Sequence, residues 1–335
     1  MNKRQRYRCL NAQCGYVFQR QKEKLPVSFS DLLVFRQYVM SKTDYALGAE
    51  RLGVSRQELS ERFTWFMSVP PSPQLMFQLF PPKCLIANSP WSYGYDGKWL
   101  GRSPILLVHR DVTHKETIWW SIARSENIAA MKADVRPLVR YLSANLPIGA
   151  VTDGKPGIGE IIKREFKLKM YQRCLVHVVR DLKNYLPKKS PLSATRALRS
   201  IAVSLTLMKT EKDVREYYRR LQTWNEVFGG CLTEKSHPYL GSKSKRRWWY
   251  THGNIRRAWR LMTTHPETLF CFLTNPLIPK TNNSLEGVNR HLKRRAGMQK
   301  GKQLSLMIWR LIFSRVKTDR QLRKLWAGWK PCLRP

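Results

Sequence analysis

Two aspartates stand out among the 23 acidic residues of the chain, because each follows an apolar or aromatic segment and precedes a glycine. Asp96 follows the aromatic segment 91–95, and Asp153 follows the mostly apolar segment 148–152. Carboxylates at the ends of neighbouring strands supply the oxygen ligands that Mg²⁺ prefers. An Asp-Gly pair is also an ordinary turn sequence. The two aspartates are therefore either metal ligands or turn residues.

A third carboxylate, Glu286, lies in the segment 281–293, which begins with residues that cap helices well. Apolar residues at 285, 288 and 292 recur at helical spacing, so we expect a helix that packs on a core. The helix dipole alone favours an acidic residue in the first turn. The basic residues Lys293, Arg294 and Arg295 follow, however, and a carboxylate beside them would be a suitable metal ligand facing a phosphodiester.

The elements that would position these carboxylates alternate in a recognisable order. We expect strands at 91–100, 104–109, 117–122, 148–152 and 169–173, with helices at 128–146 and 159–166. Three strands, helix, strand, helix and strand is the order of an RNase H-like mixed sheet. We therefore predict an α/β fold, with a helical insertion at about 190–272.

The region 28–68 is expected to be helical, with Ser30 capping its first helix. The helix over 43–52 stops at Gly53, and Ser55 with Glu58 forms the sequence of a capping box that starts another helix. Two helices joined by a short turn containing glycine are typical of a helix-turn-helix, although an ordinary helical hairpin has the same pattern.

In a helix-turn-helix, the first-turn residues Arg56 and Gln57 would contact bases in the major groove. The charge of the chain favours this interpretation. It has 61 Lys and Arg, so its formal net charge is +38, and such an excess of basic residues is typical of nucleic-acid binding.

The first 25 residues carry seven basic residues and one acidic residue, and they contain Cys9 and Cys14. The sequence around Cys14 resembles one knuckle of a zinc ribbon, which needs two pairs of ligands. The chain begins too near Cys9 to include a second pair. We expect either a degenerate ribbon without Zn²⁺ or a site completed by ligands from elsewhere.

The remaining composition limits the class of protein. The content of apolar and aromatic residues, 42%, is sufficient for a folded core. Seven scattered cysteines do not form a disulfide framework, and no apolar segment follows the charged N-terminus. We expect a cytoplasmic protein without membrane spans. The proline-punctuated segment 69–87 is expected to be a linker.

Taken together, four segments of the chain resemble the bacterial IS256-like, Mutator-type DDE transposases, over roughly residues 91–315. These segments are Asp96, Val151-Thr152-Asp153-Gly154 with Gly157-Ile158, Gln172-Arg173-Cys174-Leu175-Val176-His177, and Thr281-Asn282-Asn283-Ser284-Leu285-Glu286. The resemblance implies an RNase H-like catalytic domain at 88–335, preceded by a helix-turn-helix domain at 28–68 and a zinc-ribbon-like segment at 1–25.

The resemblance also implies roles for individual residues. Asp96, Asp153 and Glu286 would be the catalytic triad, holding two Mg²⁺ or Mn²⁺ ions for phosphoryl transfer at DNA ends. The active-site region would be supported by Cys174, His177, Asn282, Asn283 and Lys293. A zinc site is the rival interpretation of Cys174 and His177, and a buried structural cysteine with a hydrogen-bonded histidine is a third.

The implied partners are duplex DNA, as terminal inverted repeats and target, and further copies of the chain assembled on it. The protein would be associated with the nucleoid. Candidate DNA-binding residues in the catalytic region are Lys245, Arg246, Arg247, Arg290, Arg294 and Arg295. Three aromatic residues at 248–250 directly follow the basic residues 245–247. They are either stacking surfaces for distorted DNA or part of a core.

Three functions remain open from the sequence. The first is an active transposase of the DDE type. The second is a transposase-derived DNA-binding protein or regulator with an idle catalytic site. The third is another RNase H-like nuclease acting on RNA or branched DNA, which a helix-turn-helix disfavours because that motif reads duplex grooves.

Overall fold

A computed structural model of the chain describes residues 6–8, 17–19, 27–41, 44–99, 104–239, 247–283 and 303–329. The chain forms two compact units, 1–72 with 295–335 and 73–294. These units do not follow the expected boundaries, because the C-terminal helices belong to the first unit and not to a domain spanning 88–335. None of the helices within the described ranges is long and apolar enough to cross a membrane.

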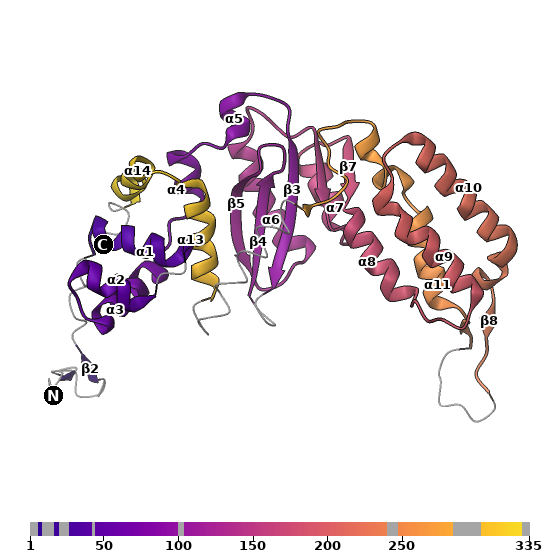
Figure 1. Cartoon of the computed structure of the whole chain (residues 1–335), viewed down its shortest axis with the longest axis horizontal. Helices are drawn as coiled ribbons and strands as arrows, with labels where there is room; N and C mark the ends of the chain where they lie inside the picture. The colour runs from indigo at the N-terminus through magenta and orange to yellow at the C-terminus, as the bar shows by residue number, and fades with distance from the viewer. Residues whose placement is uncertain are drawn as a thin grey trace. The chain divides into compact units, whose positions relative to one another are not determined.

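The first unit is a helical bundle with an aromatic core. Its helices are α1 (Phe29–Met40), α2 (Tyr45–Leu52), α3 (Arg56–Ser68), α13 (Gln303–Arg315) and α14 (Asp319–Trp329) (Figure 1). The ring of Phe35 lies edge-on to Trp309 at 5.3 Å, and Phe66 stacks on Trp329 at 5.9 Å. The indole of Trp309 also donates to the backbone oxygen of Phe66 at 2.8 Å. Residues from both ends of the chain therefore share one core.

The cap of α1 differs from the prediction. Ser28, and not Ser30, is the N-cap, and its side chain accepts a hydrogen bond from the backbone of Asp31. The Asp31 carboxylate accepts in return from the Ser28 backbone at 2.6 Å. Because this reciprocal pair satisfies two backbone donors that the helix would leave unpaired, the helix starts at Phe29 and Ser30 lies within it.

The capping box predicted for α3 is half present. The Ser55 hydroxyl accepts from the Glu58 backbone at 3.1 Å, as expected. The Glu58 carboxylate instead pairs with Arg62 at 2.6 Å, and Arg62 also reaches the fully buried carboxylate of Asp31. For the Glu58 carboxylate, an arginine one turn along the helix is a stronger partner than the Ser55 backbone N–H, because both groups are then charged.

Near the N-terminus, β1 (Arg6–Arg8) pairs antiparallel with β2 (Val17–Gln19). The predicted zinc ligands between these strands, Cys9 and Cys14, lie outside the described residues.

The segment 69–87 is not a plain linker, since it contains α4 (Pro73–Leu79) and α5 (Lys83–Ala87). Proline is well tolerated at the start of a helix, where no backbone donor is lost, and both helices begin at or directly after one. Phe77 and Cys84 are buried in the core of the sheet. The prolines therefore begin helices here and do not keep the chain extended.

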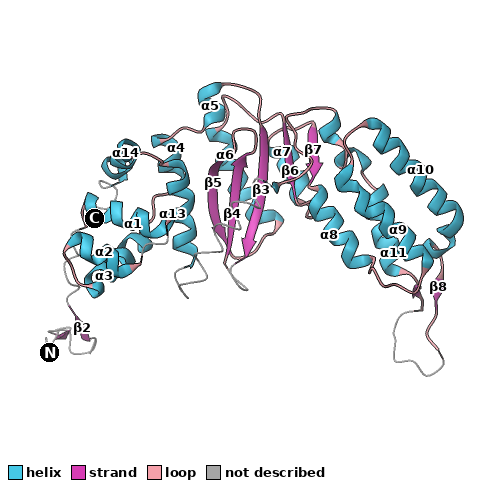
Figure 2. Ribbon diagram, viewed as in Figure 1, coloured by secondary structure: helices cyan, strands magenta, loops and turns pink. Residues whose placement is uncertain are grey.

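The second unit is built on a five-stranded mixed sheet (Figure 2). Its strands are β3 (Ser92–Trp99), β4 (Ile105–Asp111), β5 (Glu116–Ala123), β6 (Gly149–Thr152) and β7 (Met170–Arg173). In space they follow the order β5-β4-β3-β6-β7, with the first three antiparallel and β3, β6 and β7 parallel. The predicted order of strands and helices along the chain is confirmed.

Two helices, α6 (Ile128–Tyr141) and α7 (Ile158–Glu165), share the core of one face of the sheet. Tyr93 and Tyr95 of β3 point into this core together with Val135 and Ile162. Since side chains alternate along a strand, the even-numbered residues of β3, Asp96 among them, lie on the opposite face.

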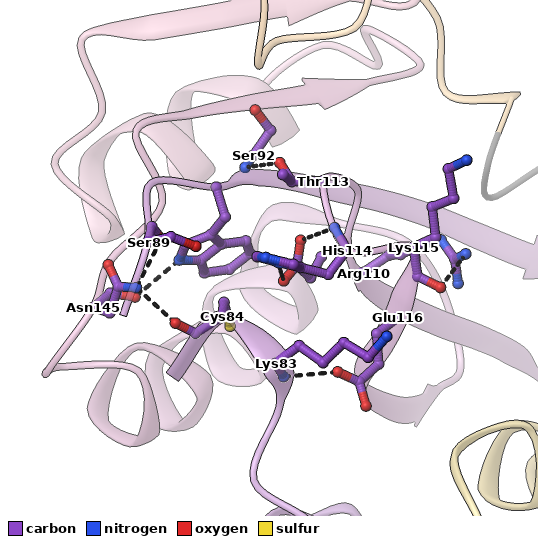
Figure 3. Close-up of polar contacts among 12 residues, drawn as sticks. Lys83, Cys84, Ser89, Ser92, Arg110, Thr113, His114, Lys115, Glu116 and Asn145 are labelled. Atoms are coloured by element: carbon purple, nitrogen blue, oxygen red, sulfur yellow. Dashed lines mark hydrogen bonds and ion pairs between the residues drawn. The ribbon is translucent and has the colours of Figure 1, made fainter. Parts of the chain in front are cut away.

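The start of β3 is fixed by hydrogen bonds that involve α5 and the turn between β4 and β5 (Figure 3). The Asn145 side chain donates to the backbone oxygens of Cys84 and Ser89, and the Trp91 indole donates to the Asn145 backbone. The backbone of Ser92 donates to the Thr113 hydroxyl at 2.9 Å. These contacts hold the N-terminal end of β3, four residues before Asp96, and they help to set the register of the strand.

The predicted helical insertion is present and has its own apolar core. It comprises α9 (Ser193–Ser204), α10 (Glu211–Phe228), α11 (Gly253–Thr263), four 3₁₀ turns (Leu205–Leu207, Gly229–Leu232, Pro266–Thr268 and Cys271–Leu273) and a hairpin of β8 (Lys235–Ser236) and β9 (Trp249–Tyr250). Helix α8 (Leu175–Tyr185), which follows β7, packs on the same core. The insertion is thus connected to the sheet through α8.

One polar network is buried inside the sheet core. His109 of β4 is fully buried, and its ring contacts the Tyr93 hydroxyl and the Asp134 carboxylate of α6. Asp134 also accepts from the Trp119 indole at 3.3 Å. The network joins the sheet to α6 through groups that would be costly to leave unpaired.

We predict that His109→Ala lowers the free energy of unfolding by about 3 kcal/mol, because it leaves the buried Asp134 without its histidine partner. The measurement is urea denaturation followed by circular dichroism. The exposed His237→Ala should stay within about 0.5 kcal/mol of wild type. Equal midpoints for wild type and His109→Ala would contradict the prediction.

Candidate active site

The structure places Asp96 within β3 and Asp153 directly after β6, and these two strands are adjacent and parallel. Gly94 of β3 lies opposite Val151 of β6, and each aspartate is two residues beyond its member of this pair. Neighbouring strands are about 4.8 Å apart. The two aspartates, far apart in sequence, therefore lie close together where β6 ends. The expectation that Asp96 ends its strand is wrong, because Asp96 lies opposite Val108 of β4 and β3 continues to Trp99.

A tight turn holds Asp153. Its Oδ1 accepts from the Lys155 backbone at 3.1 Å, which is the hydrogen bond of an Asx turn. Gly154 has a φ of +83°, and a Cβ atom there would approach the Arg173 side chain to 3.1 Å. Asp153 is thus a turn residue by its local hydrogen bond, and the same turn fixes the carboxylate beside Asp96.

A chain of polar contacts links this turn to β3. The Lys155 ammonium pairs with Glu126 Oε2 at 2.7 Å, and the Tyr95 hydroxyl donates to Glu126 Oε1 at 2.9 Å. Burial, together with the Glu126 charge, raises the pKa of Tyr95, so its hydroxyl keeps its proton and remains a donor. Because Tyr95 directly precedes Asp96, the network connects the surroundings of both aspartates.

Sequence reasoning missed Glu126 and Lys155. Glu126 lies between β5 and α6, in a polar stretch that looks like an exposed loop, yet its side chain is only 5% exposed. No periodicity or motif distinguished it. Asp181 was missed as well. It lies four residues after His177, so the two side chains share one face of α8, and this helical spacing could have identified it.

Asp181 lies close enough to the site to respond to its charges. Burial raises the pKa of its carboxyl group, His177 and Arg180 lower it, and Asp153 raises it. His177 and Asp153 are therefore part of the same electrostatic environment.

Cys174 is fully buried at the N-cap of α8, and its sulfur accepts a hydrogen bond from the Asn282 backbone at 3.2 Å. In the part of the chain that the structure describes, no three or more His, Cys, Asp or Glu side chains are grouped to hold a metal ion. The contact of Cys174 is that of a structural cysteine joining two segments.

The chain returns from the insertion to the sheet through contacts with the end of β7. The fully buried Gln172 donates to Leu269 O at 2.8 Å and accepts from the Phe272 backbone at 3.1 Å. Arg173 donates to the Thr268 hydroxyl at 2.7 Å. Three consecutive residues, 172–174, therefore bind the returning segment with their side chains.

Asn282, at the end of this segment, is 1% exposed, and its amide donates to Tyr95 O at 3.0 Å. Among the described residues, its Oδ1 accepts no hydrogen bond. Asn283 is exposed. The predicted site residues Glu286, Arg290, Lys293, Arg294 and Arg295 lie outside the described residues. The described chain thus leads up to Glu286 from a position directly beside β3.

The candidate DNA-binding residues that the structure describes lie in both units. Arg56 and Gln57 are exposed in the first turn of α3. Arg247 is exposed next to β9, while Lys245 and Arg246 lie outside the described residues. Of the two interpretations of the adjoining aromatic residues, part of a core is wrong for Trp248 and Trp249, because they are 41% and 38% exposed.

Comparison with known families identifies one part of this unit. Residues 121–228 match the model of the Mutator family of transposases. The match supports a transposase, and with it DNA as a partner and DNA recombination as the process. The matched segment contains Asp153, Cys174 and His177, while Asp96 and Glu286 lie outside it. No curated protein matches the chain.

We predict that Gln172→Leu speeds hydrogen exchange at the Phe272 amide and lowers stability by about 1–3 kcal/mol, since it leaves a buried donor and acceptor unpaired. Exchange would be followed by mass spectrometry of peptides covering 269–282. Gln222→Leu is the matched control, because that side chain contacts only the exposed Glu226 at 3.1 Å in the same unit. Unchanged exchange in Gln172→Leu would show that Gln172 does not hold the returning segment.

Proposed function

We propose that the chain is a DDE transposase of an IS256-like insertion sequence, which binds terminal inverted repeats and catalyses strand cleavage and strand transfer. The observation that carries the proposal is the placement of Asp96 within β3 and of Asp153 directly after β6, since these two strands are adjacent and parallel. Asp153 also lies within the segment similar to Mutator transposases. Neither feature alone would specify this chemistry.

The sheet supports the proposal further. An antiparallel group of three strands followed by two parallel strands, in the order β5-β4-β3-β6-β7, is what an RNase H-like domain requires. The helical insertion follows the last strand and returns directly before the segment that holds Glu286. This is the placement that a DDE transposase with an inserted domain would have.

The donor set suits a hard divalent cation. Asp96, Asp153 and Glu286 offer carboxylate oxygens, which Mg²⁺ and Mn²⁺ favour. The buried Asn282 Oδ1, which accepts no hydrogen bond from the residues that the structure describes, is a further oxygen acceptor on the segment that leads to Glu286. We infer that the three carboxylates hold two such ions. When bound, the ions would lower the pKa of the attacking hydroxyl and stabilise charge on the leaving oxygen.

The residues of the chain prepare the site. The Asx turn and the Glu126–Lys155 pair restrict the orientation of Asp153, so little conformational freedom is lost when substrate binds. The contacts of Asn282 with Tyr95 and Cys174 restrict the segment that leads to Glu286. Lys293, Arg290, Arg294 and Arg295 would bind the phosphates of the DNA end.

We infer that the helices α2 and α3 form the helix-turn-helix. Gly53 between them has a φ of +62° and ends α2, and Ser55 starts α3. The exposed Arg56 and Gln57 would then contact bases of the inverted repeat. Joining requires two DNA ends, so we propose that the active form is a homo-oligomer on DNA.

We predict that Asp96→Asn, Asp153→Asn and Glu286→Gln each reduce end cleavage and strand joining by more than about 100-fold. Even the outer partners of metal ligands typically contribute 10- to 100-fold. Products would be resolved on gels, with the inverted repeats that flank the gene as substrate and Mg²⁺ or Mn²⁺ present. Chelation with EDTA should abolish the products of the wild type.

The matched control is Glu211→Gln, whose side chain is 81% exposed on α10 and should retain full activity. Binding of inverted repeats without products from wild type would favour the idle, DNA-binding derivative. Cleavage of RNA or branched DNA in place of the repeat ends would favour a different nuclease.

We predict that Arg56→Ala and Gln57→Ala each weaken binding to the inverted repeat about tenfold and leave binding to unrelated duplexes nearly unchanged, since base contacts carry the specificity. Fluorescence anisotropy at fixed salt measures both. Arg219→Ala on α10, which removes an exposed arginine paired with Glu216, is the control. Equal losses on both DNA sequences would assign these residues to phosphate contacts.

A further inference from the structure

The insertion carries a pocket of about 610 Å³ between the β8–β9 hairpin and α11. Three aromatic and three arginine side chains line it, namely Trp248, Trp249, Tyr250, Arg256, Arg257 and Arg260. Among the described residues that line the pocket, none carries a carboxylate. Its charge is therefore positive, and its walls offer flat rings.

The aromatic side of the pocket is held in place but remains accessible. Trp248 and Tyr250 contact each other edge-on at 5.1 Å. The Lys235 ammonium lies 4.3 Å from the Trp248 ring, and the Arg256 guanidinium lies 3.6 Å from the Tyr250 ring. Trp248 and Trp249 are nonetheless 41% and 38% exposed, although apolar rings of this size are usually more deeply buried.

The basic side of the pocket comes from one helix. Arg256 donates to Leu232 O at 2.8 Å, so its guanidinium has a fixed orientation beside Tyr250. Arg257 and Arg260 are exposed, and the three arginines all lie on α11, with Arg260 in its last turn. Guanidinium groups in this arrangement suit phosphate oxygens.

We propose that this pocket binds an unpaired nucleotide of a DNA strand, with its base stacked on Trp249 and its phosphates on Arg257 and Arg260. The proposal rests on the proposed function, which supplies DNA as the substrate. In addition to the candidate active site at the sheet, the insertion would then carry a DNA site of its own. That site would be specific for strands that are not base-paired.

Two features select an unpaired nucleotide in preference to a duplex. The volume of the pocket is in the range of sites for small ligands, about 300–1,000 Å³, and accommodates a nucleotide. In the interior of a duplex the faces of the bases are covered by their neighbours, so an exposed tryptophan can stack there only on a base that has left the helix. Stacking of this kind is tolerant of sequence and is the usual means of binding single strands.

The test compares two labelled DNAs of equal length, one fully paired and one with three central unpaired nucleotides, by fluorescence anisotropy with the full chain. EDTA is present, so no cleavage occurs. We expect the wild type to prefer the partly unpaired DNA about tenfold, because one stacked base contributes roughly this factor or more. Trp249→Ala should lower the preference to near one, and Trp249→Phe should retain most of it.

Arg260→Gln should weaken binding of the partly unpaired DNA more than binding of the paired DNA. Arg215→Gln, which removes a 72% exposed arginine on α10 outside the pocket, should change neither. Circular dichroism establishes whether each variant is folded. If Trp249→Ala does not fold, the DNA preference of Trp249→Phe and the binding of Arg260→Gln still test the pocket.

A wild type without preference, or a Trp249→Ala variant that retains it, would overturn the proposal. Because binding is measured without divalent ions, these results are independent of cleavage. A chain that cleaves repeat ends but shows no preference keeps the proposed function and loses the pocket. A chain that shows the preference but cleaves nothing supports the nucleotide pocket and contradicts the proposed function.

Discussion

The hydrogen bonds between the end of β7 and the segment returning from the insertion are the contacts on which the candidate site depends. Asp96 and Asp153 are brought together by the sheet itself, but Asn282 reaches them only after a long excursion of the chain. Gln172 and Cys174 hold this segment with side chains that are fully buried. In such surroundings an unpaired backbone group is expensive, so the segment has few alternative positions.

Much of the second unit could be predicted from the sequence, because its signals are local. The strands at 92–123 and 149–173 are apolar or aromatic segments bounded by turns, and α6 and α7 have clear apolar faces. The nearness of Asp96 and Asp153 required one more assumption, namely that β3 and β6 are adjacent. The order of elements and the family resemblance supplied it, and the register of the structure agrees.

Other features were beyond local reasoning. Pro73 and Pro82 predicted a linker, but helices begin at or directly after them. These helices are stabilised because Phe77 and Cys84 pack into the core of the sheet. The position of Glu126 depends on Tyr95 and Lys155, which no sequence spacing relates to it. The grouping of α13 with α1 and α3 likewise follows from aromatic contacts between opposite ends of the chain.

The order in which the site residues are synthesised has a consequence for the newborn protein. Asp153 and Asn282 are 129 positions apart, since 282 − 153 = 129. At about 5–20 residues per second, a ribosome needs roughly 6–26 s to make the intervening chain. For most of this time Gln172, in β7, and Cys174, directly after it, lack their hydrogen-bond partners. The insertion must therefore be synthesised before the returning segment can bind β7, and an incompletely translated chain lacks an assembled site.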